Sequence, residues 1–203
     1  MNKEIYILGN YENTSASFVK PFSSVSMPGS SNYGIVISGA SQNQQIQINS
    51  AIERVAQWFL SMSPMSNKKL QKMCYYAYCW FIVFFNDIEA VTENNVGAIR
   101  VLCPERFQAW IHGPVLPGLY HRYKSYGWHD IPQVPNVPRV SAELEDLLQQ
   151  VWNAYGNFSA DELEALTHQE MPWKKARNGV QNGDACANEI SPYDVLQYYS
   201  SLG

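Results

Sequence analysis

The stretch from Ser66 to Asp87 (SNKKLQKMCYYAYCWFIVFFND) carries no charged residue between Lys72 and Asp87. Its apolar residues recur at the spacing of an α-helix, and aromatic and aliphatic residues also fill much of the opposite side. A helix that is apolar nearly all round is usually buried in a helical domain or crosses a membrane. Because the uncharged run is well short of the roughly 20 residues that a bilayer requires, the stretch predicts a buried central helix.

The start of this helix carries an unusual set of positive charges. We expect Ser66 or Asn67 to cap it. Lys68, Lys69 and Lys72 lie in or near its first turn, where the helix dipole disfavours cations. We interpret them as solvated surface lysines, with pairing to an acidic neighbour or partner as the alternative.

Length and charge limit the classes of function. A chain of 203 residues suits one domain with an appendage, or two small domains. A net charge of −4 argues against broad attraction to nucleic acid or to anionic membranes, so neither is expected as a partner. The start MNKEIYILGN is followed by polar residues, which is not the pattern of a signal peptide. Four cysteines without a CxxC pair indicate reduced thiols, and we expect a cytoplasmic protein.

Residues 1–49 differ in composition from the rest of the chain. From Pro21 to Ile52 there is no Asp, Glu, Lys or Arg, whereas Ser, Asn, Gln and Gly are abundant. Ile5–Leu8, Ile35–Ile37 and Ile46–Ile48 are prone to form strands. We expect an N-terminal arm or small extension that is either flexible or pairs as strands with itself or with a partner.

Residues 50–203 are predicted to form a helical domain. Capping boxes at Ser50–Glu53 and Ser159–Glu162 mark two helix starts, and Ser141 caps an amphipathic helix. Further helices are expected to begin near Pro117 and at Ser191-Pro192.

A small β element is expected beside these helices. Ala98–Cys103 is a strand candidate, Phe107–Ile111 is a second apolar run, and His112–Val115 reads as a sharp turn. The predicted fold class is therefore mainly α: a compact helical domain around a central buried helix with a small β element, preceded by a strand-prone N-terminal region.

The order of several short motifs resembles the Panacea antitoxin domain family, which includes SocA-like and GepA-like proteins of phages and mobile elements. The residues that carry the resemblance are Lys69–Tyr76, Ala109-Trp110, Gly113–Val115, Leu119-Tyr120, Leu166–His168, Glu170, Pro172-Trp173, Ala176-Arg177 and Ile190-Ser191. The similarity covers roughly Ser50 to Leu202, whereas Cys103–Arg106 has no counterpart in the pattern and residues 1–49 lie outside it.

The resemblance implies a mostly helical domain that binds and neutralises a co-encoded toxin protein. At least one SocA-like member acts as an adaptor that delivers its toxin to a protease, so a protease is the alternative partner. The motif residues expected to support the fold or contact the partner are Lys69, Leu70, Tyr75, Trp110, Gly113, Pro114, Val115, Tyr120, Thr167, His168, Glu170, Pro172 and Trp173. The oligomeric state is left open.

We expect no metal ion and no cofactor. His112, His121 and His129 are nine and eight residues apart, which matches no i, i+4 ligand pair, and no cysteine or carboxylate completes a set. The sequence contains no glycine-rich phosphate loop of the GxxxxGK[ST] or GxGxxG kind, so nucleotide chemistry is unsupported.

A thiol hydrolase that uses Cys103 with His168 and Glu170 is the alternative from another functional class. No nucleophile signature surrounds Cys103, so we expect no catalytic residue and no enzyme. We interpret His168 as bonding the carbonyls that end one helix, and Glu170 as the cap of the next short helix. Trp173 is then a core anchor.

A small basic cluster follows this tryptophan and consists of Lys174, Lys175 and Arg177. A solvated face is the simpler interpretation of this cluster, and contact with an acidic toxin surface is the alternative.

Overall fold

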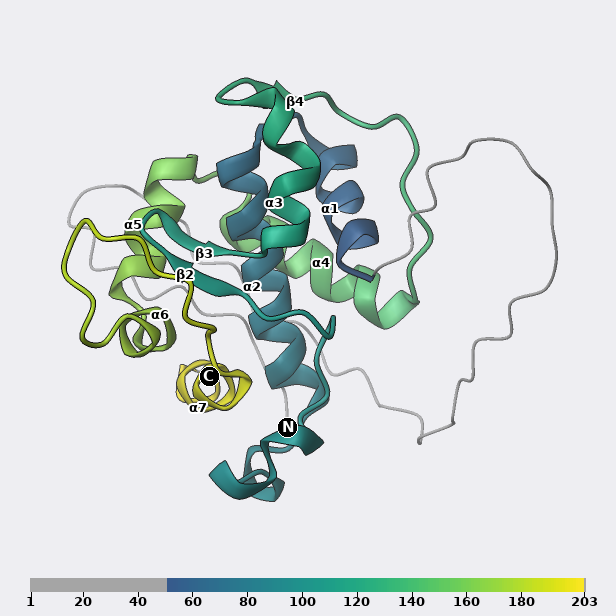
Figure 1. Cartoon of the computed structure of the whole chain (residues 1–203). Helices are drawn as coiled ribbons and strands as arrows, with labels where there is room; N and C mark the ends of the chain where they lie inside the picture. Colours follow the sequence, from purple (N-terminus) through teal and green to yellow (C-terminus); the bar gives the residue numbers. More distant parts are fainter. Residues whose placement is uncertain (1–50, 203) are drawn as a thin grey trace, which may run out of the picture.

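The computed structural model describes residues 51–202, and these are organised around helix α2, Asn67–Phe85. The Ser66 hydroxyl caps this helix by accepting a hydrogen bond from the Lys69 backbone N–H at 3.3 Å. Every residue from Leu70 to Val83 is buried. Figure 1 shows α2 running through the middle of the domain, with other elements on several sides of it. The predicted central buried helix is confirmed.

In the described part of the chain, five helices pack against α2, and a sixth joins two of them. The five are α1 (Ala51–Met62), α3 (Pro117–Tyr123), α4 (Ala142–Tyr155), α5 (Ala160–Gln169) and α7 (Pro192–Ser200). The short helix α6 (Met171–Ala176) follows α5 directly and packs against α7 (Figure 1). Residues 51–202 also form three 3₁₀ helices of one or two turns: η1 (Ile88–Ala90), η2 (Glu93–Ala98) and η3 (Lys124–Tyr126). The mainly helical fold class is confirmed.

The predicted caps define where two of these helices begin. The Ser141 hydroxyl accepts from the Leu144 N–H at 3.3 Å and starts α4. Ser159 and Glu162 form the reciprocal capping box that starts α5, with the Ser159 N–H donating to the Glu162 carboxylate at 2.7 Å. These local signals place α4 and α5 correctly because they satisfy the free N–H groups of each first turn.

The β structure within residues 51–202 consists of two short antiparallel pairs. Strands β2 (Gln108–Trp110) and β3 (Gly113–Val115) form a hairpin in which Trp110 lies opposite Gly113. Strands β1 (Met65–Ser66) and β4 (Asp130–Ile131) form the second pair, directly before α2. The β2–β3 hairpin lies across the first half of α2 (Figure 1).

The segment that leads into α7 is fastened to β2 by backbone hydrogen bonds. The Ala109 N–H donates to the Asn188 carbonyl at 2.9 Å, and the Ile190 N–H donates to the Phe107 carbonyl at 2.7 Å. The hairpin therefore positions α7 as well as α2.

Two details of the predicted β element are wrong. Ala98–Cys103 is not a strand. The Asn86 side chain forms hydrogen bonds with both backbone groups of Arg100: it accepts from the N–H and donates to the carbonyl, both at 2.8 Å. These groups are therefore not available to a neighbouring strand. The turn predicted over His112–Val115 ends at His112, since Gly113–Val115 already forms β3.

Several expectations concern residues that the structure does not describe. The strand candidates Ile5–Leu8, Ile35–Ile37 and Ile46–Ile48 lie outside residues 51–202, and so does Ser50, the capping residue of the Ser50–Glu53 box. Within the described part, the four cysteines are free thiols, as expected. Over the same residues, none of the helices combines the length and apolar character needed to cross a bilayer.

Candidate functional site

Lys72 lies at the centre of the family motif and is the most unexpected residue of α2. Its side chain is 1% exposed, and its ammonium donates a hydrogen bond to the Pro114 carbonyl at 3.0 Å. Burial lowers the pKa of Lys72 from 10.5 to about 7, since a charged amine is poorly solvated there. The backbone of Gly113 and Pro114 thus covers the side chain of Lys72.

The interpretation of the three lysines as solvated surface residues is wrong. The Lys68 ammonium pairs with Asp161 at 2.6 Å and also with Glu164. The Lys69 ammonium donates to the Gly156 carbonyl at 2.7 Å, at the end of α4. The start of α2 is enclosed by α4 and α5, which supply carboxylate and carbonyl oxygens, so the alternative of acidic neighbours holds for Lys68.

Two amide side chains at the start of α2 fix the entry into α3. The Gln71 carbonyl oxygen accepts from the Leu116 N–H at 2.9 Å, and the Asn67 amide donates to the Tyr120 carbonyl at 3.1 Å. The two amides also bond each other at 3.2 Å. No role was predicted for Asn67 and Gln71 as a pair, although two amides four residues apart in an apolar helix share one face and are a usable signal.

Aromatic and cationic side chains stack where α5 meets α6. The Trp173 ring stacks on His168 with centroids 4.1 Å apart, and its N–H donates to the Trp110 carbonyl at 3.1 Å. Arg177 lies over the same ring at 5.2 Å and donates to the Ala109 carbonyl at 2.9 Å. This stack joins α5 and α6 to the hairpin.

The stack bears on three expectations. Trp173 is half-buried and packs against the core cluster, so it anchors the edge of the core. His168 does not bond the carbonyls of its helix, because its ring faces Trp173, and its buried Nε2 has no hydrogen-bond partner within residues 51–202. Burial lowers the pKa of His168, and Lys72 and Arg177 add to that shift while Glu164 opposes it. Arg177 is buried, so it is not part of a solvated basic face.

Glu170 is enclosed by tyrosines and does not cap α6 with its side chain. The Tyr76 hydroxyl donates to one carboxyl oxygen at 3.0 Å and the Tyr199 hydroxyl to the other at 2.7 Å. Burial raises the pKa of Glu170 to about 7, against the effect of the two hydroxyls.

The tyrosine shell continues into α4. Tyr76 stacks on Tyr155 with ring centroids 3.8 Å apart, and the Trp80 N–H donates to the Tyr155 hydroxyl at 3.2 Å. The carboxyl of Glu170 is therefore the polar centre of a network that joins α2, α4 and α7.

The remaining motif residues lie in or against the packed interior of the domain. Leu70 and Tyr75 have no exposed surface, and Val115 and Pro172 are also buried. The Tyr120 ring packs edge-on against Trp110 with centroids 5.1 Å apart. Thr167 donates to the Glu164 carbonyl at 2.9 Å and lies against the Gly113 turn. The structure thus brings most of the motif together around the hairpin, whereas Glu170 faces α7.

The residues of the hydrolase alternative, Cys103, His168 and Glu170, each have other contacts. The Cys103 thiol is buried near Glu105 and Arg106, and burial raises its pKa to about 12, so it stays protonated. His168 and Glu170 belong to the α5–α6 junction and have the other contacts described above.

A metal site is also not assembled in residues 51–202, where no three His, Cys, Asp or Glu side chains converge with suitable geometry. Of the three histidines considered for such a site, His112 contacts the Glu164 carboxylate at 3.1 Å.

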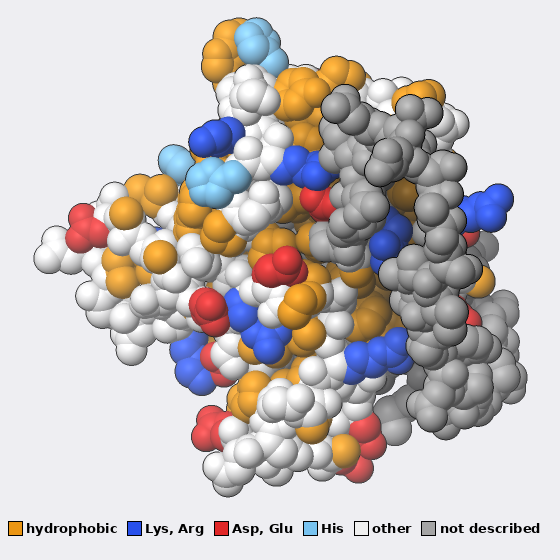
Figure 2. All heavy atoms as spheres, turned by 45° about the vertical axis from the view of Figure 1, so that its right-hand side comes forward, with side chains coloured by type: hydrophobic (Ala, Val, Ile, Leu, Met, Phe, Trp, Pro, Cys, Tyr) orange, Lys and Arg blue, Asp and Glu red, His pale blue; other side chains and the backbone are white. Residues whose placement is uncertain are grey.

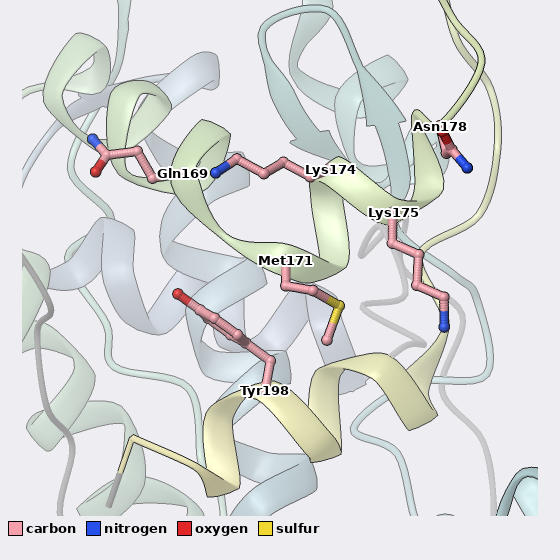
Figure 3. A pocket seen from close by; sticks show the side chains of 6 residues that line it. All are labelled: Gln169, Met171, Lys174, Lys175, Asn178 and Tyr198. Atoms are coloured by element: carbon pink, nitrogen blue, oxygen red, sulfur yellow. The ribbon is translucent and has the colours of Figure 1, made fainter.

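Among residues 51–202, two surface features expose large side chains. Trp128 is 83% exposed on the turn between η3 and β4. Figure 2 shows apolar and histidine side chains together on a projection at the top of the molecule. The second feature is an open depression of about 400 Å³ between α6 and α7, which we call the α6 groove; it is lined by Gln169, Met171, Lys174, Lys175, Asn178 and Tyr198 (Figure 3).

Comparison with known proteins identifies the motif-bearing region. The family model described as "Antitoxin SocA-like, Panacea domain" matches residues 70–174, which run from the first turn of α2 into α6. No curated protein and no solved structure matches the chain. The match spans half of the chain and contains the buried lysine, the glycine turn, the aromatic stack and the enclosed glutamate. The chain therefore belongs to the SocA-like antitoxin family with a Panacea domain.

Proposed function

We propose that this protein is the antitoxin of a toxin–antitoxin pair and neutralises a co-encoded toxin by direct protein contact. The observation that carries the proposal is the family match over residues 70–174. In this proposal the motif maintains the scaffold that presents the binding surface, and the domain carries out no reaction of its own.

The positions of the motif residues support a scaffold role. Lys72, Thr167 and Glu170 are buried and paired within the domain, so they are not available to a substrate. Residues that reach the surface, such as Trp128 and Lys174, have large or charged side chains of the kind that anchor protein interfaces. We further propose that residues 1–49 form a separate arm that contributes to recognition of the toxin.

Coexpression with the neighbouring gene tests the proposal. The toxin gene alone should arrest growth, and this protein should restore growth and co-purify with the toxin. Toxicity that persists while both proteins are present and folded would overturn the assignment. The amount of toxin should stay constant during rescue; a fall that depends on a cellular protease would favour the adaptor function instead.

A substitution at Cys103 separates neutralisation from thiol chemistry. Cys103→Ser should neutralise and bind the toxin like the wild type, because the protonated thiol has no chemical role in the proposed function. Loss of rescue with the fold and toxin binding intact would instead support the thiol hydrolase.

A further inference from the structure

The α6 groove combines an apolar floor with positively charged edges. Figure 3 shows Met171 and Tyr198 lying between α6 and α7, with Lys174 toward one side of the groove and Lys175 toward the other. Both floor residues are half-buried, so each keeps apolar surface that faces solvent. A ligand that fits this groove needs an apolar group for the floor and negative charge for the edge.

The two lysines are not equivalent. The Lys175 ammonium pairs with the buried carboxylate of Asp194 at 2.6 Å, which largely neutralises it. Lys174 is exposed and has no ion pair or hydrogen bond to any of residues 51–202. None of the residues that line the groove is acidic. Lys174 therefore provides an uncompensated positive charge beside an apolar surface.

The chain itself does not supply an acidic segment to fill this site from its N-terminal arm. Residues 1–49 contain only Lys3, Glu4, Glu12 and Lys20 as charged side chains, and their charges cancel. A nucleic acid is also a poor match, because a polyanion is bound by several cations together and the groove offers one uncompensated lysine on a protein of net charge −4. A single carboxylate of a protein segment needs only one such lysine. Charge complementarity thus points to an acidic protein segment from outside the chain.

We propose that the α6 groove binds an acidic segment of the partner toxin that contains an apolar side chain. Lys174 pairs with a carboxylate of that segment, and the apolar side chain lies against Met171 and Tyr198. The identity of the partner rests on the antitoxin function proposed above, whereas the chemistry of the groove can be tested without the toxin.

The first test uses a peptide probe and the full chain. The probe is a capped peptide with one leucine between acidic residues, and the control replaces each acid with its amide. Labelled methionine methyl groups report binding by NMR, because Met171 forms part of the floor. We expect a saturable shift of the Met171 methyl signal with a Kd on the order of 1 mM, and binding about tenfold weaker for the neutral peptide.

Two outcomes of the peptide test contradict the proposal. No shift at Met171, or an equal shift with the neutral peptide, would show that the groove does not select acidic segments. A duplex DNA fragment that shifts Met171 as strongly as the acidic peptide would assign the groove to polyanions instead.

The second test measures toxin binding by calorimetry. Lys174→Glu should weaken binding about tenfold, and the loss should shrink at high salt because the contact is electrostatic. Lys124→Glu is the matched control, since Lys124 is also exposed but lies in η3, outside the groove. We avoid Lys175 because its removal would leave buried Asp194 without its cation.

The two tests distinguish a failure of the antitoxin function from a failure of the α6 groove as the toxin site. If the wild-type chain does not bind the toxin but binds the acidic peptide, the antitoxin function fails and the groove chemistry stands. If the toxin binds and Lys174→Glu has no effect, the groove is not the toxin site.

Discussion

Gly113 lies directly against the side chain of buried Lys72: a Cβ atom at position 113 would be 2.7 Å from Lys72 Cε. The same atom would lie 2.8 Å from the Thr167 hydroxyl. The backbone of Gly113 also has a φ of +90°, a conformation that residues with side chains rarely adopt. The glycine of the motif is thus explained by packing between α2, β3 and α5.

We expect Gly113→Ala to destabilise the fold by about 2–5 kcal/mol, through backbone strain and the clash with Lys72 and Thr167. Gly118→Ala is the matched control, because Gly118 lies in α3 with open space around it and should change stability by less than about 1 kcal/mol. Urea denaturation of both variants checks the prediction. Equal stabilities of the two variants would show that Lys72 and Thr167 move away from the added Cβ atom without a loss of unfolding free energy.

Lys72 should make stability rise with pH. Its pKa is about 7 in the folded state and 10.5 for the exposed amine, so between these values the unfolded chain binds more protons. The contribution of Lys72 to stability therefore increases from about pH 7 toward pH 10, by up to about 5 kcal/mol. In Lys72→Met this contribution is absent, so the free energy of unfolding of the wild type should increase relative to that of the variant as pH rises. Lys124→Met is the control for the loss of one lysine. A difference in unfolding free energy between wild type and Lys72→Met that stays constant with pH would contradict the prediction.

Glu170 should have the opposite effect at lower pH. Its folded-state pKa of about 7 lies above the ordinary value of 4.5, so the folded state binds more protons between these values. Its contribution is fully present below about pH 4.5 and is lost as pH rises through 7, by about 3 kcal/mol. Glu170→Gln should remove this slope, as measured by chemical denaturation across this range.

A second variant identifies the cause of the Glu170 slope. The Tyr199 hydroxyl donates to the carboxyl group and lowers its pKa, so Tyr199→Phe should move the slope to higher pH. An unchanged slope in Tyr199→Phe would show that another group titrates.

Deletion of residues 1–49 should leave the helical domain folded. The core of the described region is built from side chains between Ile52 and Tyr199, in one continuous cluster. We therefore expect the melting temperature to change by less than about 4 °C, which corresponds to a change of under about 1 kcal/mol in stability. Circular dichroism during heating provides the measurement, and loss of the cooperative transition would place the arm in the core.

Local signals in the sequence were sufficient for most of the helical fold. Ser66, Ser141 and Ser159 each satisfy an N–H group of the helix that follows, so their effect does not depend on distant residues. The strand predicted at Ala98–Cys103 was wrong because a distant side chain, Asn86, holds that backbone. Such a contact leaves no periodic pattern in the sequence.

The site was less predictable than the fold, because its polar residues are buried by long-range contacts. Lys72 and Glu170 are charged side chains in the sequence, and charge alone favours a surface position. Only the hairpin that covers Lys72 and the tyrosines that surround Glu170 make their burial possible. The family motif located these residues, but their burial depends on β3, which covers Lys72, and on α7, which supplies Tyr199 beside Glu170.

The enclosure of α2 has a consequence for exchange of its amide protons with solvent. Other elements pack against this helix on several sides, so local opening of one neighbour exposes only part of it. The amides from Leu70 to Val83 should then exchange with deuterium mainly when the whole domain opens. Deuterium uptake by α2 would in that case report the global unfolding free energy directly, while the exposed turn at Trp128 exchanges far sooner.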